Sequence, residues 1–281
     1  MKLKGCSLGL TISGLVLVIF ALVWLLAIFP AMNKIPEDHH KVVNFEGTYQ
    51  VMNPETHALD EIPVKVQRVQ LAIDVQDNVL IINETVVCTH ALAGMELRDF
   101  GMTSLLGVDR STRAYVSGYG DMERSGQFCF PSDVKKESYF IWNPSAGRPL
   151  EAKFMGEQDF HGLKVFNFKI SEQDLDIGKQ EGTGLDQVMD TEINMKVEPV
   201  SGTTVDTESN MTRSLVRDGR KIPVYISSIA FTDNTVTDLV DTAADARSML
   251  LWATVYGFWI AIGVGIVLIA VGVVIAIRAK E

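Results

Sequence analysis

The sequence predicts a mainly β protein: an antiparallel, β-rich extracytoplasmic domain, folded as a barrel- or sandwich-like meander and held by N- and C-terminal transmembrane helices. Two long uncharged stretches near the ends of the 281-residue chain predict the helices. Between them, segments of alternating apolar and polar residues, separated by turn residues, predict roughly eight to ten strands joined as hairpins. The sequence has no strand–helix–strand rhythm, which argues against a parallel nucleotide-binding sheet.

The first uncharged stretch covers residues 7–30 and exceeds the roughly 20 helical residues that cross a hydrocarbon core. Lys2 and Lys4 precede it, as positive residues precede the core of a signal peptide. The apolar run is longer than the ~7–15 residues of such a core, and no small-x-small cleavage pattern follows it. We therefore expect an uncleaved signal anchor at residues 7–30, after a cytoplasmic segment of residues 1–6; a cleaved signal peptide is the alternative.

The second uncharged stretch covers residues 248–277 and is long enough to cross the bilayer with a tilt. Residues 233–247, directly before it, repeat apolar side chains at helical spacing. We expect a helical juxtamembrane stalk there, continuous with the second span and capped at its start by Asp233 or Thr235. The apolar positions of this stalk are Val236, Leu239, Val240, Ala243 and Ala246.

Small residues spaced four apart occur on one face of each span and would let two helices approach closely. Such patterns are also frequent by chance in glycine-rich spans, so pairing within one chain and separate helices both stay open. The positions are Gly5, Gly9 and Ser13 in the first span, and Ala261 and Gly265 in the second.

Positive residues flank both spans on the terminal side, with Lys2 and Lys4 before the first and Arg278 and Lys280 after the second. Short positive flanks stay in the cytoplasm. We therefore expect a two-span protein of the cell membrane with both termini inside, a cytoplasmic tail at residues 278–281, and residues 31–232 outside as the β-rich domain.

The part outside the membrane is acidic. Residues 31–247 contain 21 of the 25 Lys and Arg and 34 of the 35 Asp and Glu, a net charge of about −13. Nucleic-acid binding needs basic surfaces, so the expected partners are membrane lipids, and copies of this chain or other envelope proteins, but no nucleic acid.

Cys88 and Cys129 are the two cysteines of the outer domain. An even number of cysteines outside the membrane predicts a disulfide, which would contribute roughly 3–4 kcal/mol by closing a loop of about 40 residues; two buried free thiols are the alternative. Asn83 and Asn210 begin two Asn-x-Thr triplets and are candidate glycosylation sites.

The alternation changes phase within one predicted strand. Ile62, Val64 and Val66 share one face, and the series from Val69 to Val75 continues on the opposite face. We interpret the slip at Gln67 and Arg68 as a β-bulge or a bend. Turn residues follow at 77–78, and Asp218 with Gly219 predicts a type I′ hairpin.

The sequence offers little catalytic chemistry. The five histidines include "EDHH" at residues 37–40, which could bind a metal weakly but is typical of a solvated loop. Common metalloprotease, paired-cysteine and serine-hydrolase motifs do not occur. We therefore expect no enzyme, no cofactor and no metal site.

One central motif carries a family resemblance: "KKESYFIWNPSAGRPLEAKFMGEQDFHGLKVFNFKI", residues 135–170. It resembles the central pattern of the PorA family, largely uncharacterised two-pass membrane proteins of actinobacteria and archaea. Asn143 and His161 depart from the family pattern, where acidic residues are usual. "FEGTYQVMNPET", "VEPVSGTTVD" and "IAFTDNTV" extend the resemblance over most of the chain. The matching residues that we expect to have structural roles are Tyr139, Trp142, Pro144, Gly147, Arg148, Pro149, Gly156 and Gly162.

The resemblance bears on function without assigning catalytic residues. The family name implies a pore, which would need an oligomer because the expected membrane crossings are helices and not strands. A more distant resemblance to class B scavenger receptors, in "FEGTYQV", "GLKVFNF" and "KVEPVSGTTV", implies a domain that encloses an apolar tunnel for lipids.

Three functions remain open from the sequence. The first is a cell-surface protein that binds a ligand, a lipid or an envelope component, in an apolar cavity. The alternatives are a structural or assembly protein of the envelope and a subunit of an oligomeric porin-like channel. In each case we expect Trp142 in the core and Arg148 packed in a turn.

Overall fold

The structure, a computed structural model, describes the backbone of residues 2–279 and the side chains of residues 7–279. The chain forms two compact units. A helical unit comprises Met1–Lys34 and Asp245–Glu281, and a β-rich unit comprises Ile35–Ala244. Each unit is described by itself below.

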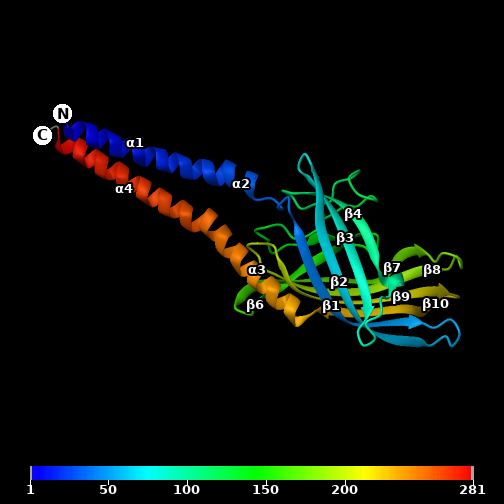
Figure 1. The fold of residues 1–281 in the computed structure, drawn as a ribbon. Coiled ribbons are helices and arrows are strands. Elements are labelled where there is room, and N and C mark those ends of the chain that lie inside the picture. The colour runs from blue at the N-terminus through cyan, green and yellow to red at the C-terminus, as the bar shows by residue number, and fades with distance from the viewer. Residues whose placement is uncertain (1, 280–281) are drawn as a thin grey trace. The chain divides into compact units, whose positions relative to one another are not determined.

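The helical unit contains the two predicted membrane spans. Segments within Ser7–Met32 and Asp233–Arg278 are long and apolar enough to cross a membrane. Figure 1 shows them as long helices, and most of their residues are not buried, as expected for helices surrounded by lipid. The helical elements are α1 (Lys2–Val23), the π-helical turn η1 (Trp24–Ile28), α2 (Phe29–Met32), the π-helical turn η3 (Trp252–Tyr256) and α4 (Gly257–Arg278). Helix α3 (Asp233–Leu251) belongs to the β-rich unit up to Ala244 and to the helical unit from Asp245.

Helices α1 and α4 pack closely through small residues. A Cβ added to Gly14 would lie 2.5 Å from the Gly265 carbonyl oxygen, so the backbones touch there. Nearer the termini, the Ser7 hydroxyl donates a hydrogen bond of 2.7 Å to the Gly272 carbonyl. The pairing left open by the sequence therefore occurs, but Gly9 and Ser13 do not carry it, because Gly9 meets nothing within 4 Å and Ser13 is exposed.

A second polar contact joins the two π-helical turns. The Trp24 indole Nε1 donates a hydrogen bond of 2.9 Å to the carbonyl of Ala253. A π-helical turn leaves backbone carbonyls less well paired than an α-helix does, so this carbonyl is a suitable acceptor. Close packing without polar contacts allows several relative orientations of two helices. This hydrogen bond favours the one in which Trp24 faces Ala253.

The described residues of the β-rich unit form one ten-stranded antiparallel sheet. Its order is β4-β3-β2-β1-β10-β9-β8-β7-β6-β5. The strands are β1 (His40–Met52), β2 (Leu59–Gln76), β3 (Val79–His90), β4 (Met102–Asp109), β5 (Tyr139–Asn143), β6 (Arg148–Phe160), β7 (Leu163–Lys179), β8 (Asp186–Val197), β9 (Thr204–Arg217) and β10 (Arg220–Phe231).

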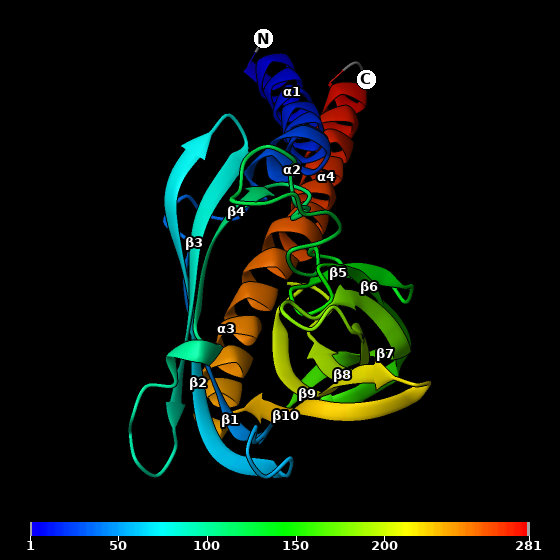
Figure 2. The same ribbon diagram turned by 90° about the vertical axis from the view of Figure 1, so that its right-hand side faces the viewer.

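This order is a meander interrupted once. Consecutive strands are neighbours everywhere except between β4 and β5, and the first strand pairs with the last, Phe45 opposite Phe231. The sheet curls into a half-barrel, so its concave face is enclosed on three sides (Figure 2). The predicted fold class is confirmed, with a curled single sheet in place of a sandwich.

The connection between β4 and β5, residues 110–138, bridges the two edge strands; we call it the closing segment. Val116 N donates to Gly107 O of β4 at 2.9 Å, and Gln127 N donates to Phe140 O of β5 at 2.8 Å. Within the segment, Tyr115 N donates to Gly126 O at 3.0 Å. Unpaired strand edges invite aggregation, and these bonds cover part of both edges.

The closing segment also docks on the turn between β8 and β9. The Arg113 guanidinium donates to the carbonyl of Ser201 at 3.1 Å, and Val134 N donates to Pro199 O at 2.7 Å. Gly202 lies in the left-handed region, with φ of 77°, and is buried against this segment. The "EPVSG" turn therefore fixes the closing segment in place.

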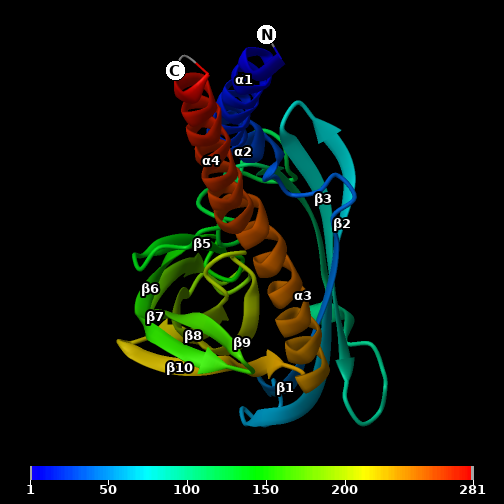
Figure 3. The ribbon, with the colours of Figure 1, turned by 90° about the vertical axis from the view of Figure 1, so that its left-hand side faces the viewer.

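Apolar side chains fill the concave side in several clusters. One cluster joins the closing segment to β5–β8, and another joins β2–β4 to Ile35. A third packs the first turns of α3 against β1 and β7 through Val43, Val165 and Leu239 (Figure 3). The buried members of the first cluster are Phe130, Val134, Leu150, Ala152, Phe166, Phe168, Ile170, Met195 and Val197.

Helix α3 begins where the sequence predicts, at Asp233, but a different residue caps it. The Thr232 hydroxyl accepts a hydrogen bond from Thr235 N at 3.3 Å, so Thr232 caps the helix, and the expectation of Asp233 or Thr235 is wrong. The Thr235 hydroxyl instead accepts from Asn44 N at 3.1 Å, which ties the helix start to β1.

The predicted hairpin at Asp218 and Gly219, between β9 and β10, is confirmed, since both residues have positive φ.

The helix pairing generates a first prediction. Gly265→Leu should separate α1 from α4, because the added side chain meets the Gly14 carbonyl and Val18, and overpacking costs about 1–3 kcal/mol. Gly263→Leu is the matched control, since a Cβ there meets nothing within 4 Å. Spin labels on Leu8→Cys and Val273→Cys, with Cys6 and Cys129 replaced by serine, would measure the interhelical distance. An unchanged distance distribution in Gly265→Leu would contradict the described packing.

The docked turn generates a second prediction. Gly202→Ala would place a Cβ 2.1 Å from the Pro131 carbonyl oxygen, and the left-handed backbone adds strain. Gly182→Ala has the same kind of backbone, with φ of 85°, but open space around it. We expect Gly182→Ala to cost about 1 kcal/mol of unfolding free energy and Gly202→Ala about 1–3 kcal/mol more. Thermal unfolding of the detergent-solubilised chain measures both, and equal losses would refute the docking.

Candidate functional site

The concave face of the sheet contains a cavity of about 550 Å³. Its walls come from both arms of the curled sheet and from the β5–β6 turn, so chain segments far apart in sequence meet there. Apolar and neutral polar side chains make up most of its lining, and four charged side chains join them, in contrast to the apolar cavity expected from the sequence. The residues lining it include Phe45, Tyr49, Val66, Arg68, Glu84, Val86, Asp99, Phe100, Met102, Asn143, Pro144, Thr191, Ser209, Met211, Arg213, Tyr225, Ser227 and Ile229.

Three aromatic rings form one wall of this concave cavity. The ring centroid of Tyr49 lies 5.2 Å from that of Phe100 and 5.4 Å from that of Tyr225, and Phe100 stacks on Tyr225 at 5.8 Å. Burial raises the pKa of Tyr49 and of Tyr225, so both phenols stay neutral at physiological pH. The wall therefore offers a broad apolar surface with neutral hydroxyl groups at its edge.

A charged network lies on the neighbouring strands β2 and β3. Arg68 Nε donates to Glu84 Oε2 at 2.7 Å, and Gln70 Nε2 donates to the same oxygen at 2.6 Å. The Glu84 side chain is 6% exposed and that of Arg68 is 36% exposed. The carboxylate is thus held by two donors inside the curl, while the guanidinium extends toward the cavity.

This network explains the phase change in the sequence of β2. The register of β2 with β1 is continuous from Leu59 to Leu71, so the predicted bulge at Gln67 and Arg68 is wrong. The irregularity lies later, between Ala72 and Asp74. The alternation inverts because polar Arg68 and Gln70 point into the concave face, which leaves Leu71 on the outer face.

Arg213 is the second guanidinium of the concave cavity. It extends from β9, and its charged carbon lies 5.8 Å from the ring centroid of Tyr225. Its Nε is buried without a hydrogen-bond partner among the described residues. Sequence analysis missed both arginines; the available signal was a charged residue at an inward position of an alternating strand.

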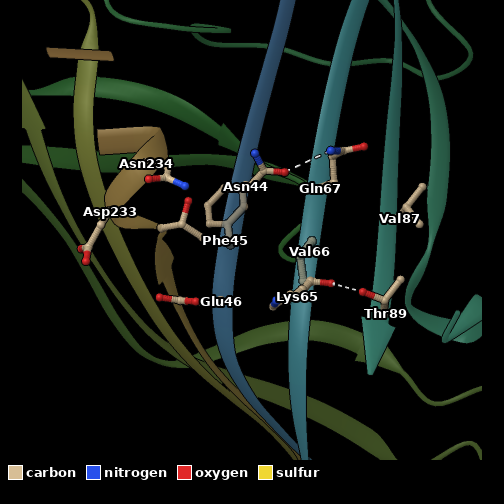
Figure 4. A pocket seen from close by; sticks show the side chains of 11 residues that line it. Asn44, Phe45, Glu46, Lys65, Val66, Gln67, Val87, Thr89, Asp233 and Asn234 are labelled. Atoms are coloured by element: carbon tan, nitrogen blue, oxygen red, sulfur yellow. Dashed lines mark hydrogen bonds between the residues drawn. The ribbon is translucent and has the colours of Figure 1, made fainter. Parts of the chain in front are cut away.

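A second hollow, of about 660 Å³, lies beside β1–β3 and the start of α3 (Figure 4). Its polar groups largely satisfy one another: Gln67 donates to the Asn44 side chain at 3.1 Å, and the Thr89 hydroxyl donates to the Lys65 carbonyl at 3.3 Å. Because its wall lacks an aromatic cluster, we take the concave cavity as the candidate site.

The family-motif residues lie around the β5–β6 hairpin and the turn after β6. Trp142, expected in the core, is half-buried; its ring packs against Tyr115 at 6.0 Å and under Arg124, both in the closing segment. Tyr139 packs on Phe130 at 5.3 Å, and its hydroxyl accepts from Lys135 N. Arg148, expected to be packed in a turn, is exposed and donates to the Asp176 carbonyl at 3.3 Å.

The remaining motif residues lie in turns, in β6 or at the lining of the concave cavity. Asn143 is buried and, with exposed Pro144, lines the concave cavity. Pro149 is half-buried in β6, opposite Trp142. Gly147, Gly156 and Gly162 have positive φ, at the hairpin turn, at the irregularity in β6 and at the turn before β7.

The predicted disulfide is not formed. Cys88 and Cys129 are both free thiols. Cys88 is buried among Tyr49, Val64 and Val66, whereas Cys129 lies on the closing segment and interacts with Lys41, Arg68 and Arg113. Burial raises the pKa of both thiols. Counting cysteines outside the membrane therefore gave the wrong pairing, because the two lie in different environments.

The two candidate glycosylation residues lie within strands. Asn83 is half-buried in β3 between β2 and β4, and its amide oxygen is buried with no hydrogen-bond partner in the described part of the chain. The Asn210 amide in β9 donates to Glu208 at 3.1 Å and its oxygen accepts from Ser228 at 2.7 Å. Glycosylation at both stays a prediction.

Among the described residues, no group of three His, Cys, Asp or Glu is arranged to hold a metal ion.

The charged network generates a third prediction. Glu84→Ala should cost about 3 kcal/mol of unfolding free energy, because it leaves the Arg68 guanidinium without its partner inside the curl. Asp186→Ala, which breaks an exposed pair with Lys179, should cost less than about 1 kcal/mol. Replacing both partners, Arg68→Met with Glu84→Leu, should recover much of the loss. Chemical denaturation measures all three, and equal effects of the two alanine variants would refute the assignment.

Comparison with known proteins places the chain in a family. A family model described as porin PorA matches residues 6–274, which include the first membrane span, all ten strands of the sheet and most of the second span. No match was found among curated proteins. The long apolar terminal helices and the family match together identify a membrane protein. The chain therefore belongs to the porin PorA family.

Proposed function

We propose that this membrane-anchored protein binds an amphiphilic component of the membrane or envelope in the concave cavity of its β-rich domain. The observation that carries the proposal is the cavity, whose volume of about 550 Å³ lies within the roughly 300–1,000 Å³ of small-ligand sites. Its aromatic wall and its few inward charges match the usual composition of such sites, a mostly apolar surface with a small number of orienting polar groups.

The proposed setting is the outer face of the cell membrane. Lys2, Lys4, Arg278 and Lys280 favour cytoplasmic termini, which puts the β-rich domain outside. The proposed role is binding and not catalysis, since the charged groups around the cavity are a structural pair, a lone guanidinium and the exposed carboxylate of Asp99, and no acid–base pair is formed among these described residues. Membrane lipids are the nearest source of an amphiphile.

A channel subunit is the second candidate, and the family description as a porin favours it. Residues 7–30 and 248–277 contain no charged side chain, and the small residues of α1 and α4 are used in packing the two helices together. One such pair cannot line a water-filled path, so a channel would require several copies. Single-channel recording in planar bilayers would detect it.

An assembly role has its own support on the outer face of β1 and β2. Three apolar residues are exposed there: Val42 of β1 at 42%, and Leu71 and Ile73 of β2 at 46% and 53%. Val42 pairs with Val69, two residues before Leu71 on β2. Contiguous exposed apolar side chains on a folded domain frequently mark contact surfaces. Copies of this chain or other envelope proteins are the proposed occupants in that case.

The binding proposal generates a fourth prediction. Native mass spectrometry of the full chain, extracted in mild detergent, should show a monomer that carries a co-purified lipid. Ser227→Phe should remove the lipid by filling the concave cavity, whereas Ser228→Phe, on the opposite face of β10, should retain it. Loss of the lipid from both variants, or from neither, would contradict the proposal. An empty ring of several copies would favour the channel or the assembly role.

A further inference from the structure

Arg213 is a cation for which the described part of the chain provides no anion. β9 places it on the concave face, between Met189 of β8 and Tyr225 of β10. Its Nε is buried without a hydrogen-bond partner, and no ion pair among the described residues includes it. Its contact with the Tyr225 ring, at 5.8 Å, fixes the guanidinium at the wall of the cavity.

The other charges of the concave cavity do not compensate Arg213. Arg68 and Glu84 pair with each other at 2.7 Å. Asp99 lines the same cavity but is exposed and forms no ion pair with Arg213 among the described contacts. Arg213 is half-buried, and charged groups that are partly removed from water are normally paired, because the loss of hydration is costly. An unpaired guanidinium in an otherwise acidic domain thus favours a negatively charged ligand group over a neutral or positive one.

The surroundings of Arg213 define the rest of the ligand. Met211, two residues before Arg213, lies on the same face of β9. The apolar wall continues through Ile229 of β10, Phe45 of β1 and Val66 of β2. An alkyl chain fits these side chains, whereas a small polar anion would leave them in contact with water. Hydroxyl groups near the charge, as on Ser227, can donate to anionic oxygens.

We propose that the ligand of the concave cavity is an amphiphile with an anionic head, a carboxylate or a phosphate, whose head contacts Arg213 and whose alkyl chain lies along the wall formed by Met211, Ile229, Phe45 and Val66. This inference rests on the proposed binding function and specifies the class of its ligand. Charge-assisted hydrogen bonds from arginine contribute about 1.5–3 kcal/mol, which corresponds to at least roughly tenfold in affinity.

The test uses the full chain, delipidated in a non-ionic detergent, and native mass spectrometry with four probes. Dodecyl phosphate carries the anionic head and the chain; dodecanol carries the chain alone; dodecyltrimethylammonium reverses the charge; inorganic phosphate is the anion alone. We expect dodecyl phosphate to bind at least about tenfold more tightly than each of the other three. Arg213→Gln should abolish this preference, and Arg213→Lys should retain part of it.

Arg217→Gln is the matched control, because it removes the same charge from an exposed position of the same strand. It should leave the preference unchanged, and thermal unfolding confirms that each variant is folded. If Arg213→Gln does not fold, the probe series on the parent chain and Arg213→Lys still decide the matter.

The outcomes separate the two proposals. Equal binding of dodecyl phosphate and dodecanol would overturn the anionic head but leave an amphiphile site in place. Binding of inorganic phosphate as tight as that of dodecyl phosphate would overturn the alkyl chain and identify a free-anion site. Absence of binding by every probe would overturn this inference, and an empty protein in the co-purification experiment would in addition overturn the proposed function.

Discussion

The pairing of the first strand with the last is the constraint on which the rest of the β-rich unit depends. β1 and β10 join the two halves of the meander, and their antiparallel register sets Phe45 against Phe231. The chain therefore enters and leaves the domain at neighbouring points of one sheet. Within the helical unit, α1 and α4 pair through Gly14 and Gly265.

The same pairing determines where the sheet is incomplete. With β1 joined to β10, the two free edges are β4 and β5, and the closing segment connects them. Trp142, Tyr115 and Arg124 pack together where this segment meets β5. Several residues of the family motif therefore serve one task, which is to close the curl and to form the rim of the concave cavity.

The sequence predicted the fold class well because most of its strands obey a simple alternation. It also predicted the two spans, since an uncharged run of sufficient length has few other structures available to it. The predictions failed where the outcome depends on the assembled sheet. Arg68 and Gln70 face inward, and the resulting change of phase was interpreted as a bulge. A disulfide between Cys88 and Cys129 was predicted because they are two cysteines in one domain, but both are free and their surroundings differ.

The candidate site could not be predicted for a physical reason. The residues lining the concave cavity come from most of the strands, and their proximity follows from the curl of the sheet, which a period-two pattern does not encode. In addition, the partner of Arg68 is known only once the register of β2 and β3 places it diagonally from Glu84. Local sequence identifies strands, whereas a charge left without a partner is a property of the assembled sheet.

The closing segment has a mechanical consequence. Neighbouring strands elsewhere in the sheet are joined by continuous ladders of backbone hydrogen bonds, but β4 and β5 are joined by a few bonds through residues 114–116 and 126–128. Parts of a protein held by few backbone bonds open at lower free energy than the rest. The curled sheet thus has one lengthwise junction with few backbone bonds, and we expect those bonds to open before the ladders of the sheet do, as far as the apolar packing of the closing segment allows.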